Sequence, residues 1–328
     1  MSASHLVAVR TPTYRRPEML RRALGSLVAQ SHGNWVCTVF DDDPDQSGKV
    51  VVDAMSDPRI RYHHNARQKF ASRNIDQCFS PENLEGADFF CVVEDDNYLL
   101  PDFMSENIQL CRRHRVEVVL RNQVIEHASG TAAARLGDTG VLDDLFVERV
   151  YRPEEFRLSL LAGIGVSNGG LFWSGNASSN FEIGYACTAT LQEYMRTYSI
   201  AEPVYVAMTP LAVWAENAEL TTRNTDISAG YYRRELDLKR AIQTLQRLTW
   251  RHTPASLRSK FMSDERFAAP ARTRARHLSK ALILAPTGES LPLREKLALR
   301  MRGVLIALLG RTTADFGKFI GSRHPTRI

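Results

Sequence analysis

The first 126 residues alternate short apolar runs with segments in which apolar side chains recur every three or four positions. The run at 89–93 is apolar throughout, which is typical of a central strand buried on both faces. This alternation predicts a doubly wound, mainly parallel α/β sheet flanked by helices. Strands are predicted at 6–9, 35–40, 60–63, 89–93 and 116–120, and helices from Pro17, at 48–55, at 72–79 and from Pro101.

The pattern changes twice further along the chain. It loosens over 127–187, where a glycine-rich stretch leads into a predicted strand at 171–173, and a helix at 188–198 and a strand at 203–206 follow. These changes predict an α/β domain over 1–227, in two halves at 1–126 and 127–227, and a helical extension over 228–328. In the extension the spacing predicts helices at 231–250, 254–263, 268–284 and 292–320.

Charge divides the chain at the same place. The 328 residues have a formal net charge of +5, but those from 231 onward hold 21 Lys and Arg against 7 Asp and Glu, so the remainder is acidic. A basic segment on an acidic body favours an anionic partner. Leucines line one face of the predicted helix at 292–320 and basic residues another, which favours a membrane surface, the body of the protein or a second subunit as its contact.

Composition excludes several other classes of protein. With 44% hydrophobic and 24% charged residues the chain is typical of globular proteins, and no stretch reaches the roughly 18 apolar residues of a transmembrane helix. The N-terminus lacks the regions of a signal peptide, and the five cysteines form no CxxC pair, so reduced thiols in the cytoplasm are expected. The extension lacks nucleic-acid-binding motifs, so no nucleic acid partner is expected.

Polar clusters follow three of the predicted strands, at the edge where ligands bind in open α/β sheets. They are 11–17 (Thr-Pro-Thr-Tyr-Arg-Arg-Pro), 41–43 (three aspartates) and 94–97 (Glu-Asp-Asp-Asn). The last cluster offers oxygen ligands without His or Cys nearby, which suits a hard divalent cation such as Mg²⁺ or Mn²⁺. A solvated acidic loop before a helix N-terminus is the alternative.

Four segments in this order resemble the inverting family 2 glycosyltransferases, which have the GT-A fold. They are 11–17, 39–42 (Val-Phe-Asp-Asp), 71–74 (Ala-Ser-Arg-Asn) and 92–101, where the acidic cluster is followed by Leu-Leu-Pro. The resemblance is good over about 5–125, weaker to about 215 and absent beyond. It implies transfer of a sugar from a nucleoside-diphosphate sugar to an acceptor hydroxyl, in polysaccharide or glycoconjugate biosynthesis.

The resemblance also implies a set of residues that bind the nucleotide sugar. The acidic cluster is similar to the family's D-x-D motif, which makes Asp96 the expected ligand of Mn²⁺ or Mg²⁺. Glu94 stands where the family has Asp, which puts its ribose contact in doubt. A capped turn at 41–43 and a structural ion pair at Arg73 are the alternatives for those positions. The implicated residues are Pro12, Thr13, Tyr14, Arg16, Asp41, Asp42, Arg73, Glu94 and Asp95.

An inverting transfer needs one carboxylate that deprotonates the acceptor hydroxyl. The family places it as the second acid of a Glu-Asp pair at the start of a helix. The best match is Gln192-Glu193, which makes Glu193 the expected base although Gln192 leaves the pair incomplete. A solvated acid in the first turn of a helix is the alternative reading of Glu193, and Glu182 and Glu216 are the other candidates for the base.

The second half is expected to meet the acceptor and the diphosphate. Asn168, Gly169 and Gly170 offer unhindered backbone there, and Trp173 either stacks on a sugar ring or packs in the core. A segment at 214–223 is expected to form a lid over the donor, with Arg223 reaching a phosphate.

The expected partners are the sugar donor and a glycan or lipid-linked acceptor. The expected location is cytoplasmic, peripheral to the inner face of the membrane through the basic helices, with self-association through those helices as the alternative. A non-catalytic GT-A-like module that binds a nucleotide sugar or a partner is the alternative function, because Glu94 and Gln192 depart from the family pattern. A nucleotidyltransferase is disfavoured because 11–14 lacks the glycine-rich loop of that class.

Overall fold

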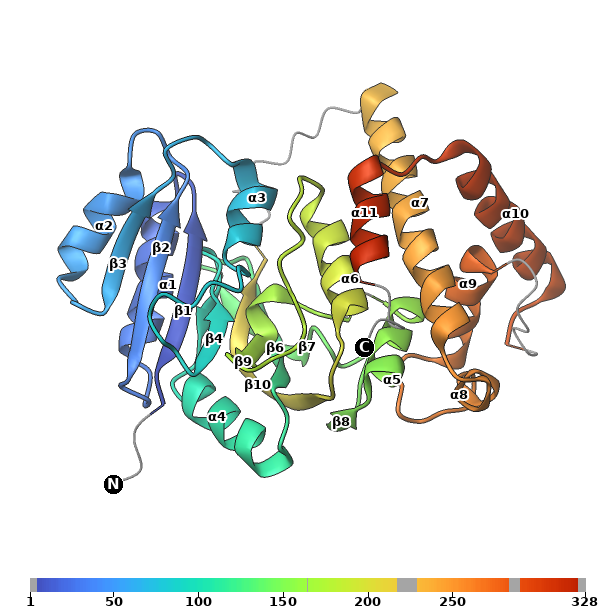
Figure 1. The fold of residues 1–328 in the computed structure, drawn as a ribbon, viewed down its shortest axis with the longest axis horizontal. Coiled ribbons are helices and arrows are strands. Elements are labelled where there is room, and N and C mark those ends of the chain that lie inside the picture. The colour runs from blue at the N-terminus through green and yellow to red at the C-terminus, as the bar shows by residue number, and fades with distance from the viewer. Residues whose placement is uncertain (1–4, 164, 217–228, 283–289, 324–328) are drawn as a thin grey trace.

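A ten-stranded mixed sheet forms the centre of the molecule (Figure 1). The computed structural model describes residues 5–163, 165–216, 229–282 and 290–323. The strands follow the order β3-β2-β1-β4-β9-β6-β10-β5, with β7 paired to β6 and β8 paired to β10. They are β1 (Val7–Thr13), β2 (Trp35–Asp41), β3 (Ile60–His64), β4 (Phe89–Val92), β5 (Tyr98–Leu99), β6 (Val118–His127), β7 (Arg135–Gly140), β8 (Arg149–Tyr151), β9 (Leu171–Ser174) and β10 (Val204–Ala215).

The part of the sheet that ends in the polar clusters is parallel. β1 pairs in parallel with β2 and with β4, and β2 pairs in parallel with β3, which confirms the doubly wound arrangement predicted for this region. β6 and β10 form a second parallel pair. β9 joins the two blocks, because it pairs antiparallel with β4 on one side and with β6 on the other.

Helices cover both faces of this sheet (Figure 1). Val7 and Val9 of β1 belong to one apolar cluster and Ala8 to another, so alternate side chains of the strand enter cores on opposite faces. The helical elements of the body are α1 (Pro17–Val28), α2 (Ser47–Met55), α3 (Phe70–Gln77), α4 (Phe103–His114), α5 (Pro153–Arg157), α6 (Ala189–Ser199) and two short 3₁₀ turns, η1 (Leu158–Leu161) and η2 (Asn168–Gly170).

The C-terminal extension is a group of helices at the end of the molecule away from β3 (Figure 1). Tyr194 and Met195 of α6 share an apolar cluster with Leu245 and Phe316, so the extension packs on the helix that carries Glu193. None of the described helices is long and apolar enough to span a bilayer. The helices are α7 (Ala229–His252), α8 (Ala255–Lys260), α9 (Ala271–Ala281), α10 (Leu293–Leu309) and α11 (Ala314–Ser322).

The prediction of one helix over 292–320 is wrong, because two helices occupy this stretch. The first ends before Gly310, which has an extended conformation with ψ of 149°. Thr313 begins the second, since its side-chain oxygen accepts a hydrogen bond from the backbone N–H of Phe316. The predicted boundary between domain and extension, at 227 and 228, lies outside the described residues.

Candidate active site

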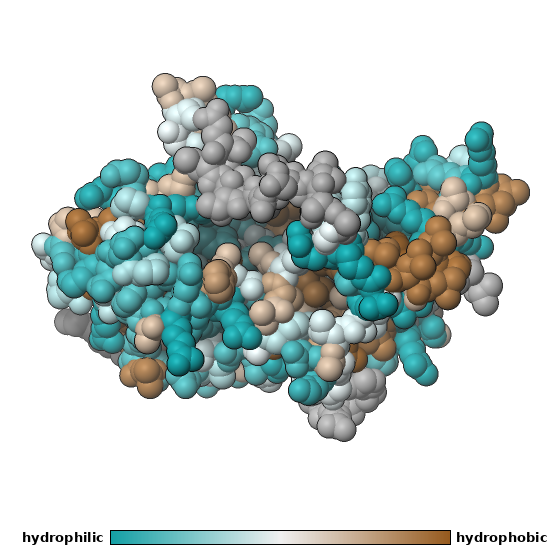
Figure 2. Space-filling model, turned by 90° about the horizontal axis from the view of Figure 1, so that it is seen from above, coloured by the Kyte–Doolittle hydropathy of each residue, from teal (hydrophilic) through white to brown (hydrophobic). Residues whose placement is uncertain are grey.

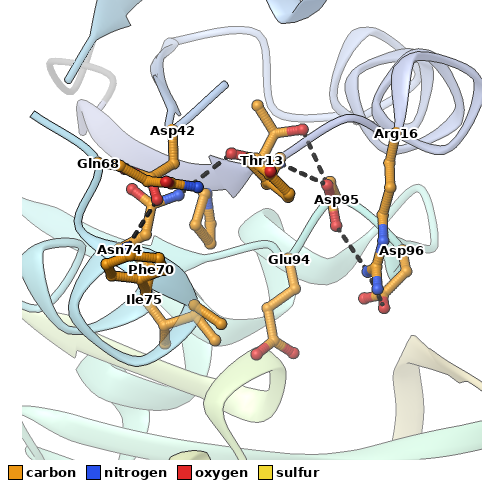
Figure 3. A pocket seen from close by; sticks show the side chains of 13 residues that line it. Thr13, Arg16, Asp42, Gln68, Phe70, Asn74, Ile75, Glu94, Asp95 and Asp96 are labelled. Carbon is orange, nitrogen blue, oxygen red and sulfur yellow. Dashed lines mark hydrogen bonds and ion pairs between the residues drawn. The ribbon is translucent and has the colours of Figure 1, made fainter. Parts of the chain in front are cut away.

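A pocket of about 390 Å³ lies at the carboxyl ends of β1, β2 and β4, where the polar clusters meet (Figure 3). Its side chains come from the ends of β1 and β2, from α3 and the segment that leads into it, and from the acidic turn after β4. Its size and its position at the edge of an open sheet are those of small-molecule sites. The lining residues are Pro12, Thr13, Tyr14, Arg16, Asp42, Gln68, Phe70, Ala71, Asn74, Ile75, Glu94, Asp95 and Asp96.

Most of the residues implicated in donor and metal binding share this pocket. Their common placement is what a single bound ligand requires, and their roles in binding it stay predictions. The predicted residues found in the lining are Pro12, Thr13, Tyr14, Arg16, Asp42, Glu94, Asp95 and Asp96.

Asp42 fixes the segment that enters α3. Its carboxylate accepts hydrogen bonds from the backbone N–H groups of Lys69 and Phe70, both at 2.7 Å, and from Asn65 Nδ2 at 2.9 Å. Phe70 has a φ of 60°, a left-handed conformation that costs a bulky residue about 1–3 kcal/mol. The two backbone hydrogen bonds hold Phe70 in place, with its ring at the pocket and 68% exposed. Gln68, Phe70 and Ile75 were not predicted, because the sequence pattern marks them only as part of a loop and a helix.

The structure corrects the assignment of Asp41 to the nucleotide. Its buried carboxylate accepts hydrogen bonds from the backbone N–H groups of Asp43 and Gly48, both at 2.9 Å, and from Tyr62 Oη at 3.0 Å. A Cβ added at Gly48 would lie 2.7 Å from Asp41 Oδ2, so the Asp41 carboxylate lies directly against the backbone of α2. Asp41 therefore caps the turn before α2, and the alternative reading as a capped turn holds for this residue.

Arg73 lies on the exposed side of α3, outside the pocket lining. Its neighbour Asn74 is buried and lines the pocket, because successive helical residues point about 100° apart. Asn74 Nδ2 donates to the backbone oxygens of Thr13 and Phe40, both at 3.2 Å, and so ties α3 to the ends of β1 and β2. The placement of Arg73 does not support its predicted contact with the nucleotide, and Asn74 takes its place in the lining.

The three consecutive acids after β4 have different partners. Asp95 Oδ2 accepts a hydrogen bond from Thr13 Oγ1 at 2.8 Å, which joins the acidic turn to the end of β1. Arg16 Nη1 lies 2.9 Å from Asp96 Oδ2 and 3.4 Å from Asp95 Oδ1. Figure 3 shows Glu94 extending away from this group. The turn therefore presents its carboxylates in two directions, toward Arg16 and toward the second half of the domain.

The acidic turn holds more negative charge than one guanidinium neutralises. Burial, followed by the charge of Asp96, raises the pKa of Glu94 and the pKa of Asp95 well above the usual carboxyl range. Such a site favours protons or a bound cation. Within the described ranges, no group of three Asp, Glu, His or Cys side chains could hold a metal ion by itself. A cation here would therefore share its coordination between carboxylates and the phosphate oxygens of a substrate, an arrangement common for Mg²⁺.

Glu193 lies in the second turn of α6 and faces the acidic turn. Its charge is one of the causes that raise the pKa of Glu94, which places the two carboxyl groups in the same region. Burial raises the pKa of Glu193 to about 7, although Arg196 and a hydrogen bond from the backbone of Asn168 oppose the shift. This is not the solvated acid of the alternative reading. Gln192 is a neutral amide and cannot replace the missing acid of the pair. It is buried, and its Nε2 donates to the backbone oxygen of Ser72 at 2.9 Å, so its role is structural.

The two other candidates for the base lie elsewhere. Glu216 Oε2 is 2.8 Å from His127 Nδ1 at the end of β10. Burial raises the pKa of Glu182, and the nearby charges of Arg10 and Arg323 oppose this rise; neither arginine lines the pocket. Neither placement favours either residue over Glu193 as the base.

Asn168 connects the two sides of the site, whereas the glycines after it serve packing. Asn168 Nδ2 donates to Glu94 Oε1 at 3.4 Å, and its Oδ1 accepts from Arg196 Nη1 at 3.0 Å. A Cβ at Gly170 would lie 2.3 Å from the backbone oxygen of Arg121, and one at Gly169 would lie 2.8 Å from a side-chain nitrogen of β6. Both glycines are buried. The prediction that they offer open backbone to a ligand is therefore corrected: they allow η2 to approach β6.

The structure also corrects the placement of Trp173 beside the acceptor. Its ring stacks with Phe79 and Phe90 and contacts Phe181, with centroid distances between 5.4 and 5.8 Å. It is buried in the core on one face of the sheet. The alternative reading, a core tryptophan, is confirmed.

Arg196 is a buried cation that the sequence did not single out. Its guanidinium pairs with Asp76 Oδ1 at 2.8 Å and stacks on the Phe79 ring at 3.8 Å. Asp76 lies on α3, which lines the pocket, and Arg196 lies on α6, so this ion pair joins the pocket to the helix that carries Glu193. The signal in the sequence is its spacing, since Arg196 follows Glu193 by three residues and shares its side of the helix.

The predicted lid at 214–223 falls largely outside the described residues, and so does Arg223. Trp214, which begins it, lies within β10 and pairs with Ile125 of β6. At its described end this segment therefore belongs to the sheet.

Comparison with known proteins identifies the N-terminal half. A family model described as "Glycosyl transferase family 2" matches residues 8–164. WcaA of Escherichia coli, named for glycosyl transfer in colanic acid biosynthesis, is 27% identical over 107 residues, which are 32% of this chain and 37% of WcaA. CgeD of Bacillus subtilis is 23% identical over 129 residues, 38% of this chain and 30% of CgeD. The chain thus matches about a third of the length of these curated relatives.

Solved structures share the fold over most of the chain. S. aureus TarS 1–349 superposes with a TM-score of 0.56 at 10% identity, covering 92% of this chain and 90% of that one. The structure of TarS 1–349 in complex with UDP-GlcNAc superposes with a TM-score of 0.55 at 12% identity, covering 92% of this chain and 89% of that one. At such identities the likeness concerns the fold. The family model, the relatives and the parallel sheet with its acidic turn agree: residues 8–164 match glycosyl transferase family 2, and the fold of the chain is the GT-A fold.

Proposed function

We propose that this protein is a metal-dependent, inverting glycosyltransferase that moves a sugar from a nucleoside-diphosphate sugar to an acceptor hydroxyl. One observation carries the proposal: the acidic turn bounds the pocket at the strand ends, and half-buried Glu193 lies near enough to Glu94 for its charge to raise the pKa of Glu94. A donor in this pocket would have its diphosphate at the acids and its sugar toward Glu193.

The pocket offers different chemistry to the two ends of a nucleotide. The exposed ring of Phe70 supplies a face on which a base stacks, and Asn74 and Thr13 supply polar groups beside it. Asp96, with Asp95 or Glu94, would hold Mn²⁺ or Mg²⁺. When bound, such an ion neutralises charge on the leaving diphosphate. Arg16, already beside Asp95 and Asp96, adds a positive charge at the same end.

Glu193 would accept the proton of the acceptor hydroxyl. The hydroxyl oxygen forms a bond to the anomeric carbon while the bond from that carbon to the diphosphate breaks, and the proton moves to the carboxylate. A base is most effective when its pKa lies near the working pH, and burial raises the pKa of Glu193 to about 7. The backbone N–H of Asn168 donates a hydrogen bond to this carboxylate, and the charge of Arg196 favours its ionised form.

We further propose that the acceptor is a glycan or a lipid-linked sugar and that the reaction serves polysaccharide or glycoconjugate assembly in the cytoplasm. The name of WcaA, which refers to colanic acid biosynthesis, supports this class of product. The acidic turn and Glu193 require only that the acceptor presents a hydroxyl group.

A donor-hydrolysis screen tests the function. Purified protein is incubated with Mn²⁺ or Mg²⁺ and a panel of UDP-, GDP- and dTDP-sugars, and released nucleoside diphosphate is measured. We expect metal-dependent release from one donor, lost in Asp96→Asn and retained in Asp102→Asn, an exposed acid six residues further along the chain.

Calorimetry with free nucleotides decides what a negative screen means. Nucleotide binding without turnover, even with acceptors supplied, would favour the non-catalytic binding module. The absence of both binding and turnover would overturn the proposal.

A further inference from the structure

Helix α10 leaves most of its apolar surface uncovered. Of its 17 residues, Gly303 and Ile306 are the buried ones. The large apolar side chains on the other side are between 52% and 74% exposed. We define these as the α10 face: Leu293, Leu297, Met301, Leu305, Leu308 and Leu309.

The α10 face points away from the body because the helix is held by its opposite side. A Cβ at Gly303 would lie 2.2 Å from the backbone oxygen of Lys280, so α10 rests directly on α9. Gln243 Nε2 of α7 donates to the Gly303 oxygen at 2.7 Å. Residues of the face recur every three or four positions and form one stripe. Figure 2 shows hydrophobic side chains gathered at the end of the molecule where α10 lies, with hydrophilic ones beside them.

Basic residues border this stripe. Arg294 and Arg302 are exposed. At about 100° per residue Arg302 falls at one edge of the stripe, half-buried Arg300 at the other, and Arg294 within the stripe at the start of the helix. The acid of α10, Glu295, is paired with Arg272 and Arg276 of α9, at 2.9 and 3.3 Å. The surroundings of the face therefore carry net positive charge, as does the whole extension.

We propose that the α10 face binds the surface of a membrane that contains anionic phospholipids, with the helix axis parallel to that surface. The leucines would enter the interfacial region, and the arginine stems would lie along it with their guanidinium groups at the lipid phosphates. A second copy of the chain fits less well, since two such faces packed on each other would bring arginine borders of like charge together. The proposal does not depend on the transfer reaction.

Vesicle sedimentation with the full chain tests this surface. The protein is mixed with sucrose-loaded vesicles of phosphatidylcholine alone or of phosphatidylcholine with an equal amount of phosphatidylglycerol. We expect binding to the anionic vesicles, weakened by 0.5 M NaCl. The variant Leu297→Ser/Leu305→Ser should lower the partition coefficient at least about tenfold. The matched control, Val50→Ser/Leu84→Ser, changes exposed apolar residues outside the extension and should bind as the unchanged protein does.

Three outcomes would overturn the proposal. The unchanged protein could stay in the supernatant with anionic vesicles, or the α10 variant could bind as well as the control. The protein could also be a dimer in analytical ultracentrifugation that the α10 substitutions convert to a monomer while no vesicle binding is seen, which would assign the face to a second copy. Circular dichroism of each variant verifies that the exposed substitutions leave the fold intact.

Discussion

The pocket and the C-terminal extension differ in which side chains they bury and which they expose. Around the pocket, acids such as Asp41 and Asp95 are buried and hydrogen-bonded, and the apolar residues of β1 and β4 are enclosed on both faces of the sheet. On α10 the apolar residues are exposed and basic residues border them. Buried acids create the electrostatic conditions for chemistry, whereas exposed leucines create a contact surface. The two regions should therefore respond independently to substitution.

The largest separation between the regions is expected from Glu193→Gln. If Glu193 accepts the acceptor proton, the substitution should lower kcat about 10²- to 10⁴-fold with little change in donor binding. In the same assay with a soluble acceptor, Leu297→Ser/Leu305→Ser should keep full activity, and Glu182→Gln serves as the acidic control. Glu193→Gln with near-normal kcat would remove Glu193 from the mechanism.

A comparable contrast is expected in stability. Arg196→Met leaves Asp76 buried without its cation, which should lower the free energy of unfolding by about 3–5 kcal/mol. Arg272→Met removes an exposed partner of Glu295 and should cost about 1 kcal/mol or less. Urea unfolding of both variants measures the difference. Equal losses would mean that the ion pair between α3 and α6 does not hold the two halves together.

If Glu193 is the base, the pH dependence of turnover should follow its pKa. In the proposed mechanism Glu193 acts when ionised. Since burial raises its pKa to about 7, kcat/KM should rise about tenfold per pH unit below that value and level off above it. The test is the pH profile of kcat/KM from pH 5 to 9, with Glu182→Gln as a control that keeps the same midpoint. A profile that is flat between pH 5 and 7 would assign proton transfer to a different group.

The smallest effects are expected at Phe70, where stability and binding should change in opposite directions. Phe70→Gly removes a side chain from a left-handed conformation and should stabilise the fold by about 1 kcal/mol. Loss of the ring should raise the donor KM about tenfold, since stacking on one base is worth about 1–3 kcal/mol. Phe70→Ala separates the two effects, because it loses the ring and keeps the strain. An unchanged KM in both variants would show that the ring does not stack on the donor.

The sequence predicts the parallel part of the fold well, because strands buried on both faces must be apolar throughout. The run at 89–93 is the clearest example, and β4 occupies Phe89–Val92. The place of β9 between β4 and β6 depends on contacts between distant segments, which local patterns do not encode. β7 was not predicted because its sequence, Arg-Leu-Gly-Asp-Thr-Gly, has no apolar alternation.

The candidate site shows the same limit at the level of single residues. Asp41 and Asp42 are adjacent and chemically equal in the sequence, but alternate strand positions send one into the turn before α2 and the other to the pocket. In the same way, helical geometry turns Asn74 toward the pocket and leaves Arg73, its neighbour in the sequence, outside the lining. A motif thus locates the site to within a residue or two, and the backbone decides which side chain faces the ligand.

The position of β9 limits how this protein could be recombined. The segment that matches the family, 8–164, contains β4 and β6, but the strand that separates them comes from Leu171–Ser174. In a chimera that replaces 8–164 with the same segment of a relative, β9 of this protein would lie between two strands of the relative. Exchange points that keep the sheet intact must lie beyond β10, so the two halves of the domain would have to be inherited together.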